Sequence, residues 1–100
     1  MSNYLDPQLY IDGAWRTTEQ TLPVINPATE ETIGHVPIAR PQDLDDALEA
    51  ADRGFAVWRR VAPRDRADLI REAARLMRER QDEIAHSITL EHGKPFAQAQ

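Results

Sequence analysis

The chain has 100 residues, with 12 basic and 17 acidic side chains, a net charge of −5 and no cysteine. This length allows one domain at most. The negative charge argues against a nucleic-acid partner, and the absence of cysteine excludes disulfides, thiolate metal sites and a cysteine nucleophile from these residues. No apolar run is long enough to span a membrane, and residues 1–10 lack the features of a secretory leader. We therefore expect a cytoplasmic protein without a membrane partner.

Residues 1–40 are predicted to form short antiparallel strands and turns. Two apolar runs, 9–11 and 14–15, flank Asp12-Gly13. Asp-Gly between such runs indicates a tight hairpin, because both central residues of its turn need a positive φ. A second pair of strands, 22–25 and 32–38, is expected around a turn at 26–31, where Pro27 favours a reversal of the chain.

Residues 41–92 are predicted to form three amphipathic α-helices. The first begins at Pro41, which suits the first helical turn, the second near Pro63 and the third near Gln81. Gly93 can adopt the left-handed conformation that ends a helix, and Pro95 prevents its continuation. Residues 93–100 then start a further segment.

Apolar side chains recur at three- and four-residue steps along the first two expected helices, which is typical of a stripe that packs against another surface. The stripe includes Leu44, Leu48, Phe55, Trp58, Ile70 and Met77. A self-sufficient domain would bury these side chains internally, whereas a segment of a larger fold would expose some of them as a patch. We expect the isolated chain to be marginally stable and to expose such a patch.

The residues themselves reveal no active site. Gly93-Lys94 lacks the upstream glycine and the following hydroxyl of a phosphate-binding loop. The three histidines are too scattered for a metal site. The acidic pairs Asp45-Asp46 and Glu30-Glu31 fall at a helix start and a turn, where water would surround them, whereas general acid–base catalysis needs a shielded or paired carboxyl. We therefore assign no catalytic and no cofactor-binding residue.

Four stretches in order along the chain nevertheless resemble the opening of the aldehyde dehydrogenase superfamily. They are LYIDGAW at 9–15, VINPATEE at 24–31, FAVW at 55–58 and TLEHGKPF at 89–96. The last stretch is most similar to the succinate-semialdehyde dehydrogenase branch. The resemblance implies an α/β fold in which residues 1–100 are the N-terminal part of the nucleotide-binding domain.

The activity that this resemblance implies is oxidation of an aldehyde, with succinate semialdehyde as a candidate, to a carboxylate with NAD or NADP. In the family a cysteine thiolate attacks the aldehyde and a glutamate activates the hydrolytic water, and both lie downstream of this region. The resemblance also implies a homo-oligomer. These 100 residues alone should be inactive.

One candidate site carries over from the family. Many members bind a monovalent cation through backbone carbonyls at positions that correspond to Ile25 and Glu91 here. A hard cation with oxygen ligands is chemically reasonable, although a further ligand would lie beyond Gln100. The alternative for this site is that Glu91 simply ends a helix beside arginine or water.

The alternative for the chain as a whole is a non-catalytic helical interaction module or a decayed remnant of the family.

Overall fold

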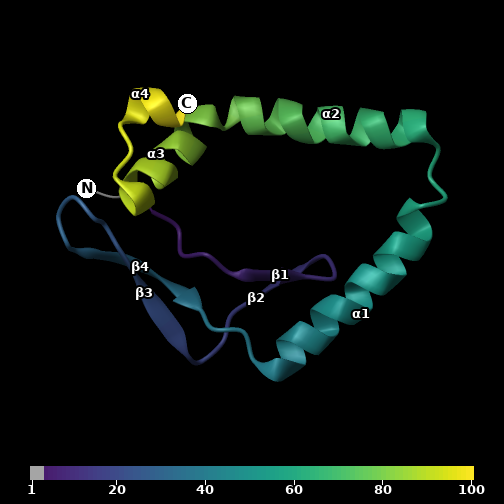
Figure 1. The fold of residues 1–100 in the computed structure, drawn as a ribbon, viewed down its shortest axis with the longest axis horizontal. Helices are drawn as coiled ribbons and strands as arrows, with labels where there is room; N and C mark the ends of the chain where they lie inside the picture. Colours follow the sequence, from purple (N-terminus) through teal and green to yellow (C-terminus); the bar gives the residue numbers. More distant parts are fainter. Residues whose placement is uncertain (1–3) are drawn as a thin grey trace.

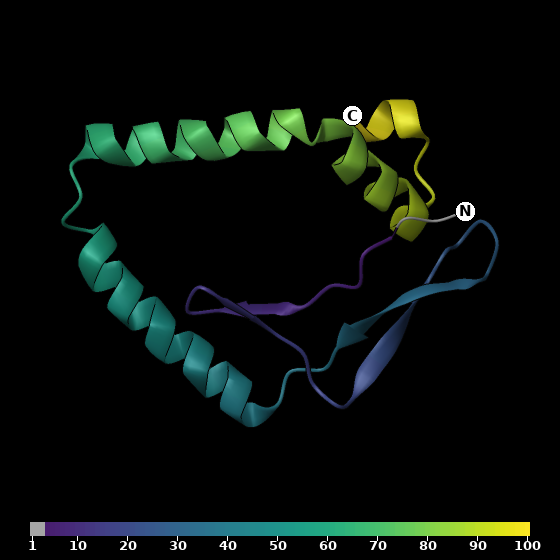
Figure 2. The same cartoon turned by 180° about the vertical axis from the view of Figure 1, so that it is seen from behind.

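A computed structural model describes residues 4–100, and its elements follow the perimeter of a flat, open ring (Figure 1). The radius of gyration is 16.8 Å and the extents are 48 × 34 × 16 Å, whereas a compact domain of this length has a radius near about 13 Å. The view from behind shows the same opening between the strands and the helices (Figure 2). Residues 1–3, on which the expectation of no secretory leader partly rests, lie outside the described part.

The first hairpin pairs β1 (Leu9–Ile11) with β2 (Ala14–Arg16) in antiparallel register, with Tyr10 opposite Trp15. Its turn has φ values of 52° at Asp12 and 77° at Gly13. Because both values are positive, the twist of the turn matches that of the strands. The hairpin predicted from Asp-Gly is confirmed.

The second hairpin pairs β3 (Thr21–Ile25) with β4 (Thr32–Pro37), close to the predicted strands. The register shifts between Val24 and Ile25, so that Ile25 lies opposite Thr32. Burial along β4 does not alternate strictly, since Gly34 and Pro37 are both buried. At Gly34 the burial comes from the N-terminal segment, because Tyr4 and Asp6 lie against it.

Three long helices follow, as predicted: α1 (Pro41–Trp58), α2 (Pro63–Glu79) and α3 (Gln81–His92). Proline occupies the first turn of α1 and of α2, where its missing N–H costs no hydrogen bond. Gly93 ends α3 in the left-handed conformation at φ 80°. A short helix, α4 (Phe96–Ala99), comes after Pro95 and lies against α3 (Figure 1).

Opposite charges line the exposed face of α2. Arg75 contacts Glu72 at 2.6 Å and Glu79 at 2.5 Å, and Arg71 contacts Asp68 at 3.1 Å. These pairs have the three- and four-residue spacing at which helical side chains meet, and water screens them at such exposure, so they contribute little to stability.

The apolar core within the described residues is very small. Only Ile11 and Ala85 are buried hydrophobic residues, with 8% and 0% of their surface exposed. By contrast, Leu48 is 70% exposed and Phe55 is 62% exposed on α1, and Ile70 and Met77 on α2 are 62% and 60% exposed. The predicted apolar patch is therefore present, because the open ring brings no other element over these side chains.

Candidate functional site

The two positions predicted to carry cation-binding carbonyls lie on neighbouring segments. Ile25 ends β3, immediately before the turn that contains Pro27, and Glu91 lies in the last turn of α3. A Cβ placed on Gly93 would lie 3.2 Å from Cγ of Pro27, so the turn after β3 rests against the C-terminal end of α3. The fold thus brings together two regions that are more than 60 residues apart in the sequence.

The backbone around Glu91 favours a free carbonyl. In an α-helix a carbonyl accepts from the N–H four residues later, and for Glu91 that residue is Pro95, which has no N–H. The hydrogen bond that closes this end of α3 runs instead from the N–H of Gly93 to the carbonyl of Thr89, at 2.9 Å. The Glu91 carbonyl is consequently available to a ligand that prefers oxygen.

The side chain of Glu91 has a partner that the sequence did not reveal. The hydroxyl of Tyr4 donates a hydrogen bond to the Glu91 carboxylate. Partial burial, and then this hydrogen bond, raise the pKa of Tyr4 to about 12, because a partly desolvated phenolate would face a carboxylate. The Glu91 side chain therefore contacts a tyrosine from the N-terminal segment at this end of α3.

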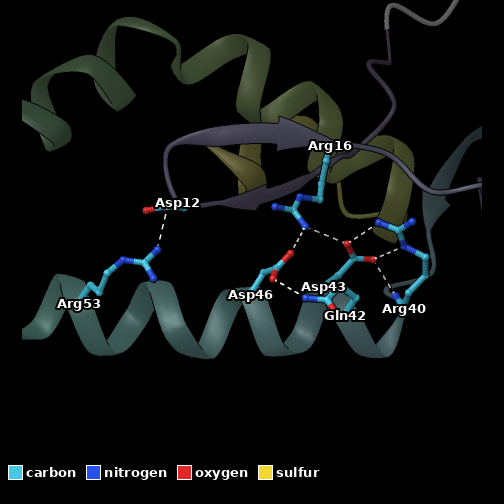
Figure 3. Close-up of polar contacts among 7 residues, drawn as sticks. All are labelled: Asp12, Arg16, Arg40, Gln42, Asp43, Asp46 and Arg53. Carbon is cyan, nitrogen blue, oxygen red and sulfur yellow. Dashed lines mark hydrogen bonds and ion pairs between the residues drawn. The ribbon is translucent and has the colours of Figure 1, made fainter.

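A second polar cluster joins the first hairpin to the start of α1 (Figure 3). The side chain of Asp43 is fully buried and accepts hydrogen bonds from Arg16 at 3.0 Å and from the guanidinium of Arg40 at 2.9 Å. It also accepts the backbone N–H of Arg40 at 2.8 Å, as in a capping box. The side-chain and backbone hydrogen bonds of Arg40, with the further bond from Arg16, hold the pKa of Asp43 well below its usual range.

Three further contacts extend this cluster along α1 (Figure 3). Asp46 accepts from Arg16 at 2.8 Å and from Gln42 at 2.8 Å, and these bonds lower its pKa. The expectation that water surrounds the Asp45-Asp46 pair is therefore wrong for Asp46, which is only half exposed because the hairpin covers it. At the tip of the hairpin Asp12 pairs with Arg53 at 3.0 Å.

The remaining candidates do not form a chemical centre. Within residues 4–100 no group of three or more His, Cys, Asp or Glu side chains could hold a metal ion. None of the helices in that range is long and apolar enough to cross a membrane. The polar clusters that do exist are ion pairs, and ion pairs position elements of a fold without themselves supplying a nucleophile or a base.

A comparison with protein families shows which family the chain belongs to. The sequence profile described as "Aldehyde dehydrogenase family" matches residues 15–100. The chain belongs to the aldehyde dehydrogenase family. The match covers α1 to α4, the β3–β4 hairpin and the last two residues of β2, and it includes the stretches at 24–31, 55–58 and 89–96. The resemblance seen in the sequence is confirmed.

Curated members of the aldehyde dehydrogenase family are similar to the chain over nearly all of its length. This chain is 44% identical over 94 residues to glutarate-semialdehyde dehydrogenase of Pseudomonas aeruginosa. The aligned residues make up 92% of this chain and 20% of that protein. The resemblance to the semialdehyde dehydrogenases is thereby confirmed. The chain spans about one fifth of the length of the curated relatives it matches.

Solved enzyme structures contain the same open arrangement. The chain matches a variant of aldehyde dehydrogenase C from Pseudomonas syringae, in complex with NAD+ and octanal, with a TM-score of 0.87 and 38% identity, over 92% of this chain and 19% of that one. It matches an NADP-dependent enzyme of Escherichia coli with a TM-score of 0.87 and 36% identity, over 92% of this chain and 20% of that one. The expected fold is confirmed.

Proposed function

We propose that this chain is the N-terminal part of the nucleotide-binding domain of an NAD(P)-dependent aldehyde dehydrogenase. Its role there is architectural, because α1 and α2 cover a surface of the rest of the enzyme with their apolar stripes. The observation that carries this proposal is the exposure of Leu48, Phe55, Ile70 and Met77 in an arrangement that also occurs within chains about five times as long. A soluble protein rarely leaves several large apolar side chains exposed together, and such a group marks a surface that another part of a protein covers.

The reaction that we propose for the complete enzyme is oxidation of an aldehyde to a carboxylate. The relative from Pseudomonas aeruginosa is named for glutarate semialdehyde, which supports a semialdehyde substrate, and succinate semialdehyde differs from it by one methylene. NAD and NADP both remain candidates, since the two similar structures are described with NAD+ and as NADP-dependent. We place no catalytic and no cofactor-binding residue in these 100 residues. A homo-oligomer in the cytoplasm is part of the same proposal.

For the monovalent cation we propose the backbone carbonyls of Ile25 and Glu91. The contact between Pro27 and Gly93 supports this assignment, as does the missing N–H donor at Pro95. Two carbonyls are too few ligands for a hard cation, so the complete enzyme would have to supply the others. The cation would then tie the strand half of the ring to the helical half.

A chimeric enzyme tests the proposed function. This chain replaces the matching segment of the Pseudomonas aeruginosa glutarate-semialdehyde dehydrogenase, and formation of NADH or NADPH is measured with glutarate semialdehyde. We expect an active enzyme. Within the chimera, Leu48→Gln should lower the yield of folded enzyme, because it places an amide in the covered stripe, whereas Glu49→Gln, one residue along the same helix, should not.

Two results would count against the proposal. One is a chimera that is folded and soluble but inactive with both cofactors. The other is equal tolerance of Leu48→Gln and Glu49→Gln, which would mean that the α1 stripe is not covered in the enzyme.

A further inference from the structure

The segment that precedes β1 lies across β4. The Asp6 carboxylate accepts a hydrogen bond from the backbone N–H of His35 at 3.0 Å. Gly34 is buried beneath this segment, and a Cβ there would lie 2.8 Å from the ring of Tyr4 and would also collide with the carboxylate of Asp6. The bare backbone of Gly34 is therefore what allows the segment to pass so closely.

Tyr4 reaches beyond β4 to the helical half of the ring. Its hydroxyl donates to Glu91 in the last turn of α3, although 87 residues separate the two. In the described part of the chain, the β3–β4 hairpin and α3 make few direct contacts with each other. At this end of the ring, the contacts of Tyr4, together with that between Pro27 and Gly93, join the two halves.

We propose that Tyr4 and Asp6 form a latch that holds the β3–β4 hairpin against the C-terminal end of α3. The latch sets the separation between the segment around Ile25 and the segment around Glu91. This inference rests on the proposed function only in so far as those segments supply a cation site. Tyr4 acts through Glu91 and is a positioning residue rather than a ligand.

The geometry explains why both residues are needed. The hydrogen bond that Asp6 accepts comes from the hairpin, through the N–H of His35. Tyr4 has its ring over Gly34 and its hydroxyl on Glu91, so it contacts both halves at once. Loss of the hydroxyl should loosen the hold of the hairpin on α3 and leave the contact between Pro27 and Gly93. Loss of the Asp6 carboxylate should loosen the N-terminal segment on β4.

The separation can be measured directly, because the chain has no cysteine and two introduced cysteines can be spin-labelled selectively. Suitable positions are Ala28→Cys, in the turn after β3, and Lys94→Cys, after α3, since both residues are exposed. Pulsed electron paramagnetic resonance spectroscopy then gives the distribution of distances between the two spin labels. The comparison is made in the full chain, with the helical signal in circular dichroism as the test of folding.

We expect a narrow distribution in the labelled parent. Tyr4→Phe and Asp6→Ala should broaden it and shift it to longer distances while the helical signal is unchanged. The matched controls are Tyr10→Phe and Gln8→Ala, at two exposed residues of the same region, and they should leave the distribution as in the parent.

A broad distribution in the parent would overturn the latch, and so would distributions in Tyr4→Phe and Asp6→Ala that superimpose on the parent. The cation site has a separate readout in the chimeric enzyme, which supplies the remaining ligands. If sodium chloride in place of choline chloride leaves the thermal stability of the chimera unaltered, that result counts against the cation site. The comparison of Tyr4→Phe with Tyr10→Phe tests the latch independently of the cation.

Discussion

Arg16 and Asp43 form a contact between the strand half and the helical half of the chain. The Asp43 side chain is fully buried, and Arg16 donates to it at 3.0 Å from 27 residues earlier in the sequence. The same guanidinium nitrogen contacts Asp46 at 2.8 Å. Since the apolar core is very small, this buried carboxylate is a main determinant of how the first hairpin lies on α1.

Asp43→Asn should therefore loosen the hairpin and the start of α1 together. The amide has one oxygen acceptor where the carboxylate has two, so its NH2 group faces donors that it cannot satisfy. It also leaves Arg40 without this charge partner and Arg16 with Asp46 alone of its two carboxylates. We expect the midpoint of thermal unfolding, followed by circular dichroism, to fall by at least about 5 °C. Asp45→Asn is the matched control, because Asp45 is exposed two residues further along the same helix. Equal midpoints for the two variants would contradict this account of Asp43.

Stability should fall in acid because of the same cluster. The hydrogen bonds of Arg40 lower the pKa of Asp43, and those of Arg16 lower the pKa of Asp46. A carboxyl whose pKa is lower in the folded state stabilises the fold fully above its unfolded pKa, about 3.9, and this contribution is lost as the pH falls through the folded pKa. Urea unfolding between pH 7 and pH 2 should show the loss beginning near pH 4. In Asp43→Asn the decline should be shallower, and a decline as steep as in the parent would argue against the assignment.

Two glycines should respond in opposite ways to alanine. At Gly34 a Cβ would collide with Tyr4 and Asp6, so Gly34→Ala should displace the N-terminal segment and speed the exchange of the His35 amide hydrogen. At Gly54, in the middle of α1, a Cβ would meet nothing within 4 Å. Gly54→Ala should therefore stabilise the helix by about 0.5–1 kcal/mol. Hydrogen exchange resolved by residue measures both effects, and equal exchange at His35 in Gly34→Ala and the parent would be incompatible with the close approach.

The exposed stripe should bind a hydrophobic dye. Leu48 and Phe55 are 70% and 62% exposed, so Leu48→Gln with Phe55→Gln should reduce dye fluorescence and change the stability of the isolated chain by less than about 0.5 kcal/mol. Ile11→Gln is the contrasting variant, because Ile11 is 8% exposed and its replacement should destabilise the first hairpin. Highly cooperative unfolding of the parent without dye binding would favour the alternative of a self-sufficient interaction module.

Local chemistry made the secondary structure predictable. Asp12-Gly13 predicts a turn with two positive φ values. Pro41 and Pro63 predict helix starts, and Gly93 with Pro95 predicts a helix end. Each of these signals acts within a few residues, where the backbone preference of one side chain decides the conformation. The exposed stripe was predictable for a related reason, since helical periodicity is a local pattern.

The polar contacts across the ring could not be predicted in the same way. An aspartate in the first turn of a helix is ordinarily explained by the helix dipole, so nothing local indicates that Asp43 is buried under Arg16. The Tyr4–Glu91 hydrogen bond likewise depends on tertiary structure. For Ile25 and Glu91, the sequence resemblance supplied the positions, and the packing of Pro27 on Gly93 is the physical reason that the two segments meet.

The most direct test of the central claim is the intact mass of the protein that carries these residues in the cells that produce it. Antibodies against residues 1–100 would capture it, and mass spectrometry would give the mass. If the chain works as one part of an aldehyde dehydrogenase, the mass should be several times 11.4 kDa. A mass of 11.4 kDa would contradict this account and would leave the exposed apolar stripes of α1 and α2 to a separate partner.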